Sequence, residues 1–216
     1  MARGLYCKLA LRNLKNNRRV TLPYLLSGAG IILMFYCITA LTLGIDEEAM
    51  YGGSSVSAMM GFGVFVIALF ALLFLFYTNS FLIKRRKKEL GLYNILGMEK
   101  RHIARVLVIE TLLTALCSLA LGLALGILAS RLLFWALGLV VGAAVPIAFA
   151  VPLPAVTGTL MLFGAIYLLT LGYNLVQLKL SRPIQLLRGG ETGEKEPKAH
   201  WVLAVLGAVL LGAGYY

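Results

Sequence analysis

Four long stretches of this sequence contain almost no charged residue, and clusters of lysine and arginine separate them. A helix needs about 20 apolar residues to cross the roughly 30 Å hydrocarbon layer of a membrane. Residues 20–45, 58–83, 106–129 and 156–178 meet that length, so the sequence predicts four membrane-spanning helices. The chain is 60% hydrophobic and 13% charged over 216 residues, more apolar than a soluble core of this size can bury. We therefore expect an all-α integral membrane protein, which excludes a soluble enzyme, a secreted domain and a disordered chain.

A fifth apolar run occupies residues 201–216 and is too short to cross a membrane, because 16 residues make a helix of about 24 Å. We expect this run to be the start of a fifth span, truncated because the chain is a fragment of a longer protein. A short tilted helix at a natural C-terminus is the alternative interpretation.

The distribution of basic residues predicts the orientation of the spans. Residues 1–19, 84–105 and 179–200 carry six, eight and five lysines and arginines, whereas residues 46–57 carry none and residues 130–155 carry one. Loops rich in lysine and arginine stay on the cytoplasmic side of a membrane. We therefore expect a multi-pass protein of the cell membrane with a cytoplasmic N-terminal segment, a cytoplasmic loop between the second and third spans, and a cytoplasmic linker after the fourth.

Residues 131–155 are apolar enough to be mistaken for a further span. Counting them as one would place the basic linker at 179–200 outside the cell, against the charge rule. Gly138 and Pro146 also oppose a long helix there. We expect an outward-side segment that lies against the membrane surface or dips into it, within a helical core at residues 58–178.

The spans hold few groups that could carry out chemistry. No His, Asp or Glu cluster has metal-ligand spacing, no nucleophile has a neighbouring base, and the sequence lacks a phosphate-binding loop. We therefore expect no enzymatic activity, no cofactor and no metal, so that any transport takes its energy from a partner. Cys37 and Cys117 fit small buried apolar residues. Nucleic-acid binding is disfavoured because the basic residues form collars between spans and no continuous groove-tracking face.

Glu110 is the one carboxylate inside a predicted span. An ionisable group within a membrane is a candidate for function. The other interpretation is a structural ion pair, with Arg105 or with the basic residues at 84–88, near the start of the third span, where a helix favours a negative charge.

Small residues recur at four-residue intervals along the third span, at Ser118, Gly122, Gly126 and Ser130. This spacing puts them on one face of a helix, where another helix can approach closely. The stripe therefore predicts a helix-packing face without identifying its partner.

The loop between the second and third spans has its own apolar pattern. Leu92, Ile95 and Leu96 recur at helical spacing. Gly91 would let the chain turn as it leaves the second span, and Gly97 would cap a helix at its C-terminal end. We expect a short amphipathic helix at the membrane surface, whose apolar side chains can dock a soluble partner.

These residues resemble a known family. The run at 88–98, KELGLYNILGM, is similar to the E-[ILF]-G-x-x-x-x-L-G signature of FtsX-like ABC transporter permeases. Residues 79–88, 11–15 and 182–187 look like the bacitracin-export branch of that family, the BceB-like permeases.

The resemblance implies a transport subunit that pairs with a separate cytoplasmic ATPase, which is itself a dimer, and often with a membrane sensor kinase. The loop would be the element that couples to the ATPase, with the contact carried by Glu89, Gly91, Leu92, Ile95, Leu96 and Gly97. Permeases of the bacitracin type have ten spans and an extracellular domain, and they protect bacteria from peptide antibiotics.

Two other functions stay open at the level of the sequence. FtsX-like permeases for lipoprotein release, macrolide export or cell-division signalling usually place a large domain straight after the first span, where this chain has only residues 46–57. A membrane scaffold without transport activity, anchored by its basic loops, is the other alternative.

Overall fold

The computed structural model describes residues 12–14, 17–44, 53–95, 98–141 and 151–180. Its long helices are α2 (Arg18–Leu43), α3 (Gly53–Ile95), α4 (Lys100–Val141) and α5 (Leu153–Leu180). Each contains a segment long and apolar enough to cross a membrane: Thr21–Leu43, Gly53–Arg85, Lys100–Ala136 and Leu153–Leu180. The predicted all-α membrane fold and its four spans are therefore confirmed. The fifth apolar run lies outside the described residues.

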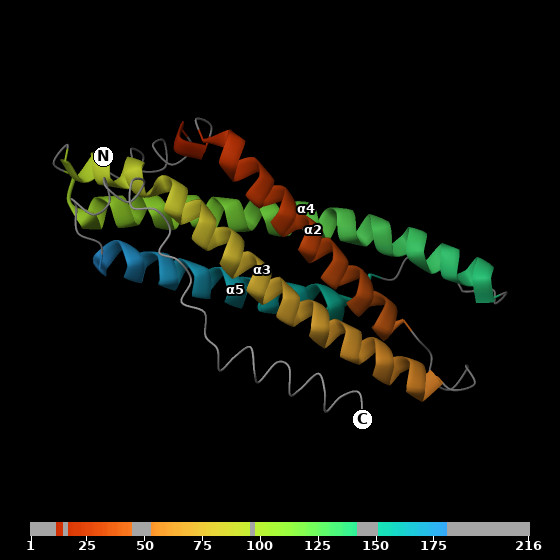
Figure 1. Cartoon of the computed structure of the whole chain (residues 1–216). Helices are drawn as coiled ribbons and strands as arrows, with labels where there is room; N and C mark the ends of the chain where they lie inside the picture. The colour runs from red at the N-terminus through yellow and green to blue at the C-terminus, as the bar shows by residue number, and fades with distance from the viewer. Residues whose placement is uncertain (1–11, 15–16, 45–52, 96–97, 142–150, 181–216) are drawn as a thin grey trace, which may run out of the picture.

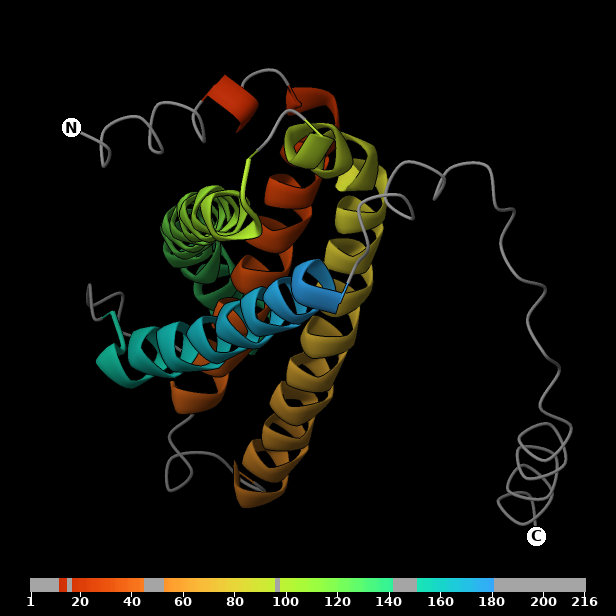
Figure 2. The same cartoon turned by 90° about the vertical axis from the view of Figure 1, so that its left-hand side faces the viewer.

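Helix α2 packs against the other three helices. Figure 1 shows α2 crossing α4 obliquely, and Figure 2 shows α4 beside it when the bundle is turned. The interface between α2 and α4 is the most extensive in the bundle. The first span is thus the element around which the others are arranged.

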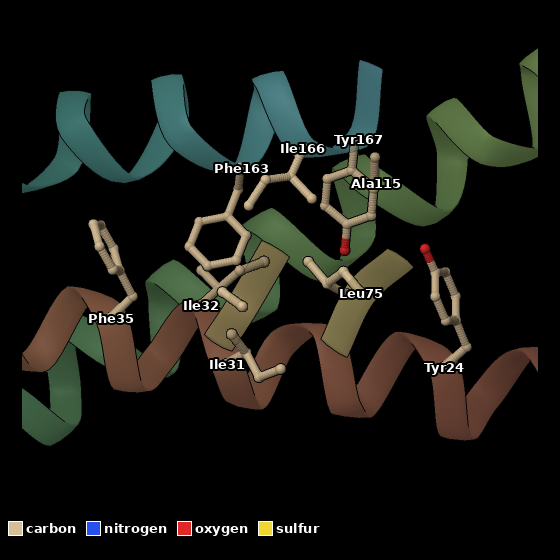
Figure 3. Packing of buried hydrophobic residues seen from close by; sticks show 10 residues of the cluster. Tyr24, Ile31, Ile32, Phe35, Leu75, Ala115, Phe163, Ile166 and Tyr167 are labelled. Atoms are coloured by element: carbon tan, nitrogen blue, oxygen red, sulfur yellow. The ribbon is translucent and has the colours of Figure 1, made fainter. Parts of the chain in front are cut away.

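The apolar core lies between α2 and the facing sides of α3 and α5. Ile32 of α2, Leu75 of α3 and Phe163 of α5 are all fully buried there (Figure 3). The Phe35 and Phe163 rings meet edge to face with their centroids 5.6 Å apart. Because lipid is as apolar as leucine, contacts of this kind hold membrane helices together through close packing more than through the hydrophobic effect.

The outer side of α3 carries large apolar side chains that are mostly exposed. Phe62, Phe65, Phe70 and Leu73 all expose more than half of their surface. Such a surface would be unfavourable in water but matches a hydrocarbon environment. It is the expected arrangement for a helix at the periphery of a membrane bundle.

The prediction of a separate short helix after the second span is wrong, because the second span and this segment form one continuous helix, α3, up to Ile95. Gly91 lies inside this helix and does not break it. A glycine in a helix costs only about 1 kcal/mol, and the lysines, arginines and leucines around it are good helix formers. Figure 2 shows the last, yellow-green turns of α3 bending away from the axis of the rest, so the change of direction occurs as a bend in a continuous helix.

The third span is also longer than predicted. Helix α4 runs from Lys100 to Val141 and passes through Gly138, so the first part of the expected outward-side segment continues the span. Its 42 residues correspond to about 63 Å, roughly twice the hydrocarbon thickness. A single glycine again fails to end a helix whose neighbours are apolar. Residues 142–150, which include Pro146, lie outside the described residues.

Candidate functional site

The start of α2, the last turns of α3, the start of α4 and the end of α5 lie at the same end of the bundle (Figure 1). We call this end the basic end. Lys84 and Arg85 are exposed there, and the Arg85 guanidinium lies 4.8 Å from the centre of the Phe81 ring. An arginine stacked on an aromatic ring at the end of a span is typical of a membrane–water interface.

The residues predicted to couple to a partner belong to this end. Glu89 and Ile95 lie in the last turns of α3, whereas Leu96 and Gly97 lie outside the described residues. Gly91 is buried, and Leu92 exposes 53% of its surface. The structure therefore presents Leu92 as an apolar side chain beyond the apolar segment of α3, which ends at Arg85.

Hydrogen bonds form the first turn of α4 and connect it to α5. The backbone carbonyl of Glu99 accepts hydrogen bonds from the amides of His102 and Ile103, at 2.9 and 3.3 Å. The Lys100 ammonium donates to the backbone carbonyl of Lys179, in the last turn of α5, at 3.1 Å. A cation at the C-terminal end of a helix is favourable because it satisfies carbonyls that have no partner within the helix. The beginning of α4 is thus held to the end of α5.

The small-residue stripe of α4 lies against α2. A methyl group added to Gly122 would lie 2.6 Å from Ile32 Cβ and 2.9 Å from the carbonyl oxygen of Ala29. At Gly126 it would lie 3.0 Å from the Tyr36 ring. These distances are at or below normal van der Waals contact, so the two helices approach as closely as they do because these positions lack side chains.

Hydrogen bonds accompany this close approach. Ser118 donates to the backbone carbonyl of Leu25 in α2 at 3.3 Å, and the Cys37 thiol donates to the carbonyl of Gly126 at 3.6 Å. Ser130 is buried one turn further along and donates to Ile127 in its own helix. Cys117, expected to be buried, is exposed instead.

A pair of asparagines joins α3 to α5 inside the bundle. The Asn79 amide donates to the Asn174 side-chain oxygen at 2.8 Å, and Asn174 donates back to Asn79 at 3.1 Å. Both side chains are almost completely buried. Each amide thus satisfies the other in a place where an unpaired polar group would be costly.

Glu110 lies beside this pair and is 4% exposed. It lines a small cavity to which all four helices contribute. The polar groups of this cavity are Thr21, Tyr24, Asn79, Glu110, Thr111, Thr114 and Asn174. Thr114 donates to the backbone carbonyl of Glu110 at 2.8 Å. The carboxylate therefore belongs to a polar cluster inside the spanning region, which the position of Glu110 in the sequence did not reveal.

Sequence reasoning missed the asparagine pair and the two polar residues of α2. The signal available was the presence of Asn79 and Asn174 within otherwise apolar runs, since polar residues in spans usually face protein. Among the described residues, no group of three His, Cys, Asp or Glu side chains could hold a metal ion. The functional groups of the polar cluster are one carboxylate, two amides and several hydroxyls.

Residues 61–179 match the family described as FtsX-like permease C-terminal, more than half of the chain. The chain therefore belongs to the FtsX-like permease family, as its loop signature indicated. It is a multi-pass membrane protein of the ABC permease type.

Individual relatives agree with this assignment. The chain is 29% identical over 214 residues to the uncharacterized ABC transporter permease YvcS of Bacillus subtilis, covering 96% of this chain and 32% of that protein. It is 30% identical over 217 residues to the bacitracin export permease protein BceB of the same organism, covering 97% and 33%. A BceB of Halalkalibacterium halodurans is 26% identical over 212 residues, covering 96% and 33%. The chain thus spans about a third of the length of the curated relatives it matches.

Proposed function

We propose that this chain is part of the membrane subunit of an ABC transporter that is energised by a separate ATPase and confers resistance to peptide antibiotics of the bacitracin type. The observation that carries the proposal is the match of residues 61–179 to the FtsX-like permease family, together with the family signature at the α3–α4 connection. ABC permeases take their energy from an ATPase, and the sequence has no phosphate-binding loop of its own.

The ATPase docks at the basic end, on the cytoplasmic side of the membrane. The count of basic residues supports this orientation, because residues 1–19, 84–105 and 179–200 hold 19 of the 20 lysines and arginines. Exposed Leu92 supplies an apolar contact at that surface. The Lys100–Lys179 contact passes any displacement of the connection on to α5.

The proposed substrate class comes from the relatives, two of which are named bacitracin export permeases. The short connection between α2, which ends at Leu43, and α3, which begins at Gly53, favours this branch over permeases with a large domain after the first span. A membrane sensor kinase is a further proposed partner, from the same resemblance.

Replacing Leu92 with aspartate is expected to weaken capture of the ATPase by about tenfold or more, because a buried apolar contact at the centre of an interface contributes about 2 kcal/mol. The measurement is co-purification of an ABC ATPase subunit from the host with the tagged membrane chain. Leu43→Asp is the matched control, since Leu43 is 51% exposed at the opposite end of the bundle. Equal capture by the Leu92 variant and the parent would exclude the coupling role and favour the scaffold alternative.

Deleting the coding sequence from its host is expected to lower the bacitracin concentration that the cells tolerate by several-fold, while tolerance of a ribosome-directed antibiotic stays the same. Growth in graded concentrations of the two drugs measures both effects. Unchanged bacitracin tolerance, with ATPase capture intact, would point to an FtsX-like permease for another substrate.

A further inference from the structure

The cavity beside Glu110 contains two hydroxyl groups that the described helices leave unpaired. Thr21 and Tyr24 of α2 are each 5% exposed and line the cavity. Neither Thr21 Oγ1 nor Tyr24 Oη has a hydrogen-bond partner among the described residues. Figure 3 shows the Tyr24 side chain rising from α2 toward α5, into the interior of the bundle. Burying a hydroxyl without a hydrogen-bond partner is unfavourable, so each of these two hydroxyls needs such a partner.

The dimensions of the cavity match a water molecule. Its volume is about 20 Å³, and a cavity needs roughly 10–15 Å³ to hold one water. A buried water also needs two to four polar partners. Thr21 and Tyr24 supply two of them, and the amide, hydroxyl and carboxylate groups across the cavity supply acceptors and donors for the rest.

We propose that this cavity is an internal hydration site, in which water hydrogen-bonded to Thr21 and Tyr24 connects α2 to the polar groups of α3, α4 and α5. A metal ion is a poor fit, because a cation such as Ca²⁺ requires six to eight oxygen ligands and the cavity offers one carboxylate. A dry cavity is also a poor fit, because cavities that stay empty are lined by apolar groups.

The water gives α2 a polar connection to the rest of the bundle that does not depend on direct side-chain contact. A bridging water is nearly as favourable as a direct hydrogen bond and can re-form with altered partners when helices shift. This inference does not rest on the proposed transport function.

Water-edited solid-state NMR of the full chain in lipid bilayers, with labelled tyrosine, tests the proposal. Magnetisation from water is expected to reach the Tyr24 ring, whose signal is assigned by its loss in Tyr24→Phe. Tyr36 is the control, because it is fully buried and does not line the cavity. No transfer at Tyr24 above that at Tyr36 would overturn the proposal.

Thermal unfolding is a second test, because Tyr24→Phe is expected to shift the unfolding midpoint in opposite directions at a hydrated and at a dry site. Tyr24→Phe removes a partner from the bound water, so its unfolding midpoint is expected to fall by about 2–4 °C. At a dry site the same change removes an unpaired buried hydroxyl, and the midpoint would rise. A rise for Tyr24→Phe would contradict hydration.

Discussion

Replacing Gly122 with alanine is expected to destabilise the bundle by about 1–3 kcal/mol, the usual cost of overpacking a close interface. The added carbon would lie 2.6 Å from Ile32 Cβ and 2.9 Å from the Ala29 carbonyl oxygen. Neither neighbour is the far end of a flexible side chain, so α2 and α4 must move apart to accept it. That separation weakens the most extensive helix contact in the bundle.

The same substitution elsewhere provides a matched control. A carbon added to Gly164 or Gly158 of α5 would meet nothing within 4 Å. Gly164→Ala should therefore leave stability unchanged or raise it by up to about 1 kcal/mol, because alanine favours a helix more than glycine does. Unfolding of Gly122→Ala, Gly164→Ala and the parent in lipid bicelles measures the difference. If Gly122→Ala is as stable as Gly164→Ala, the close approach of α2 and α4 is not what limits the packing.

Part of this interface was visible in the sequence and part was not. The four-residue spacing of Ser118, Gly122, Gly126 and Ser130 marks one face of a helix because helical geometry alone places them together. The identity of the facing helix depends on the path of the whole chain, which a local spacing does not encode. Only the structure brings Ala29 and Ile32 of α2 against Gly122.

The ends of the helices were harder to predict than the spans. Apolar length determines whether a segment can cross the membrane, so four spans followed directly from composition. Glycines at positions 91 and 138 suggested interruptions, but helices continue through both. The cost of one glycine is small beside the backbone hydrogen bonds of a long helix, since unpaired backbone groups are costly near lipid.

The polar cluster around Glu110 could be predicted from the sequence only in part. Glu110 stood out in the sequence because carboxylates in spans are rare. Asn79 and Asn174 lie 95 residues apart, and their pairing depends on how α3 and α5 are placed side by side. A polar residue in an apolar run indicates that some partner exists, while the fold determines which one it is.

Replacing Asn79 with leucine is expected to cost about 1–3 kcal/mol, because it removes two hydrogen bonds and leaves the Asn174 amide buried without them. Asn174→Leu is expected to cost a similar amount for the same reason. The double variant Asn79→Leu with Asn174→Leu should be clearly more stable than the sum of the two losses implies, because two apolar side chains of similar volume then face each other.

The measurement is a double-mutant cycle: the parent, both single variants and the double variant are unfolded in lipid bicelles. The cycle gives the coupling energy between Asn79 and Asn174. A coupling near zero, with the two losses simply adding, would mean that the amides do not hold α3 to α5. A large coupling energy would show that the asparagine pair specifically joins α3 to α5. The pair lines the same cavity as Thr21, Tyr24 and Glu110. Because one asparagine cannot be satisfied without the other, α3 and α5 are expected to move together at this level of the bundle.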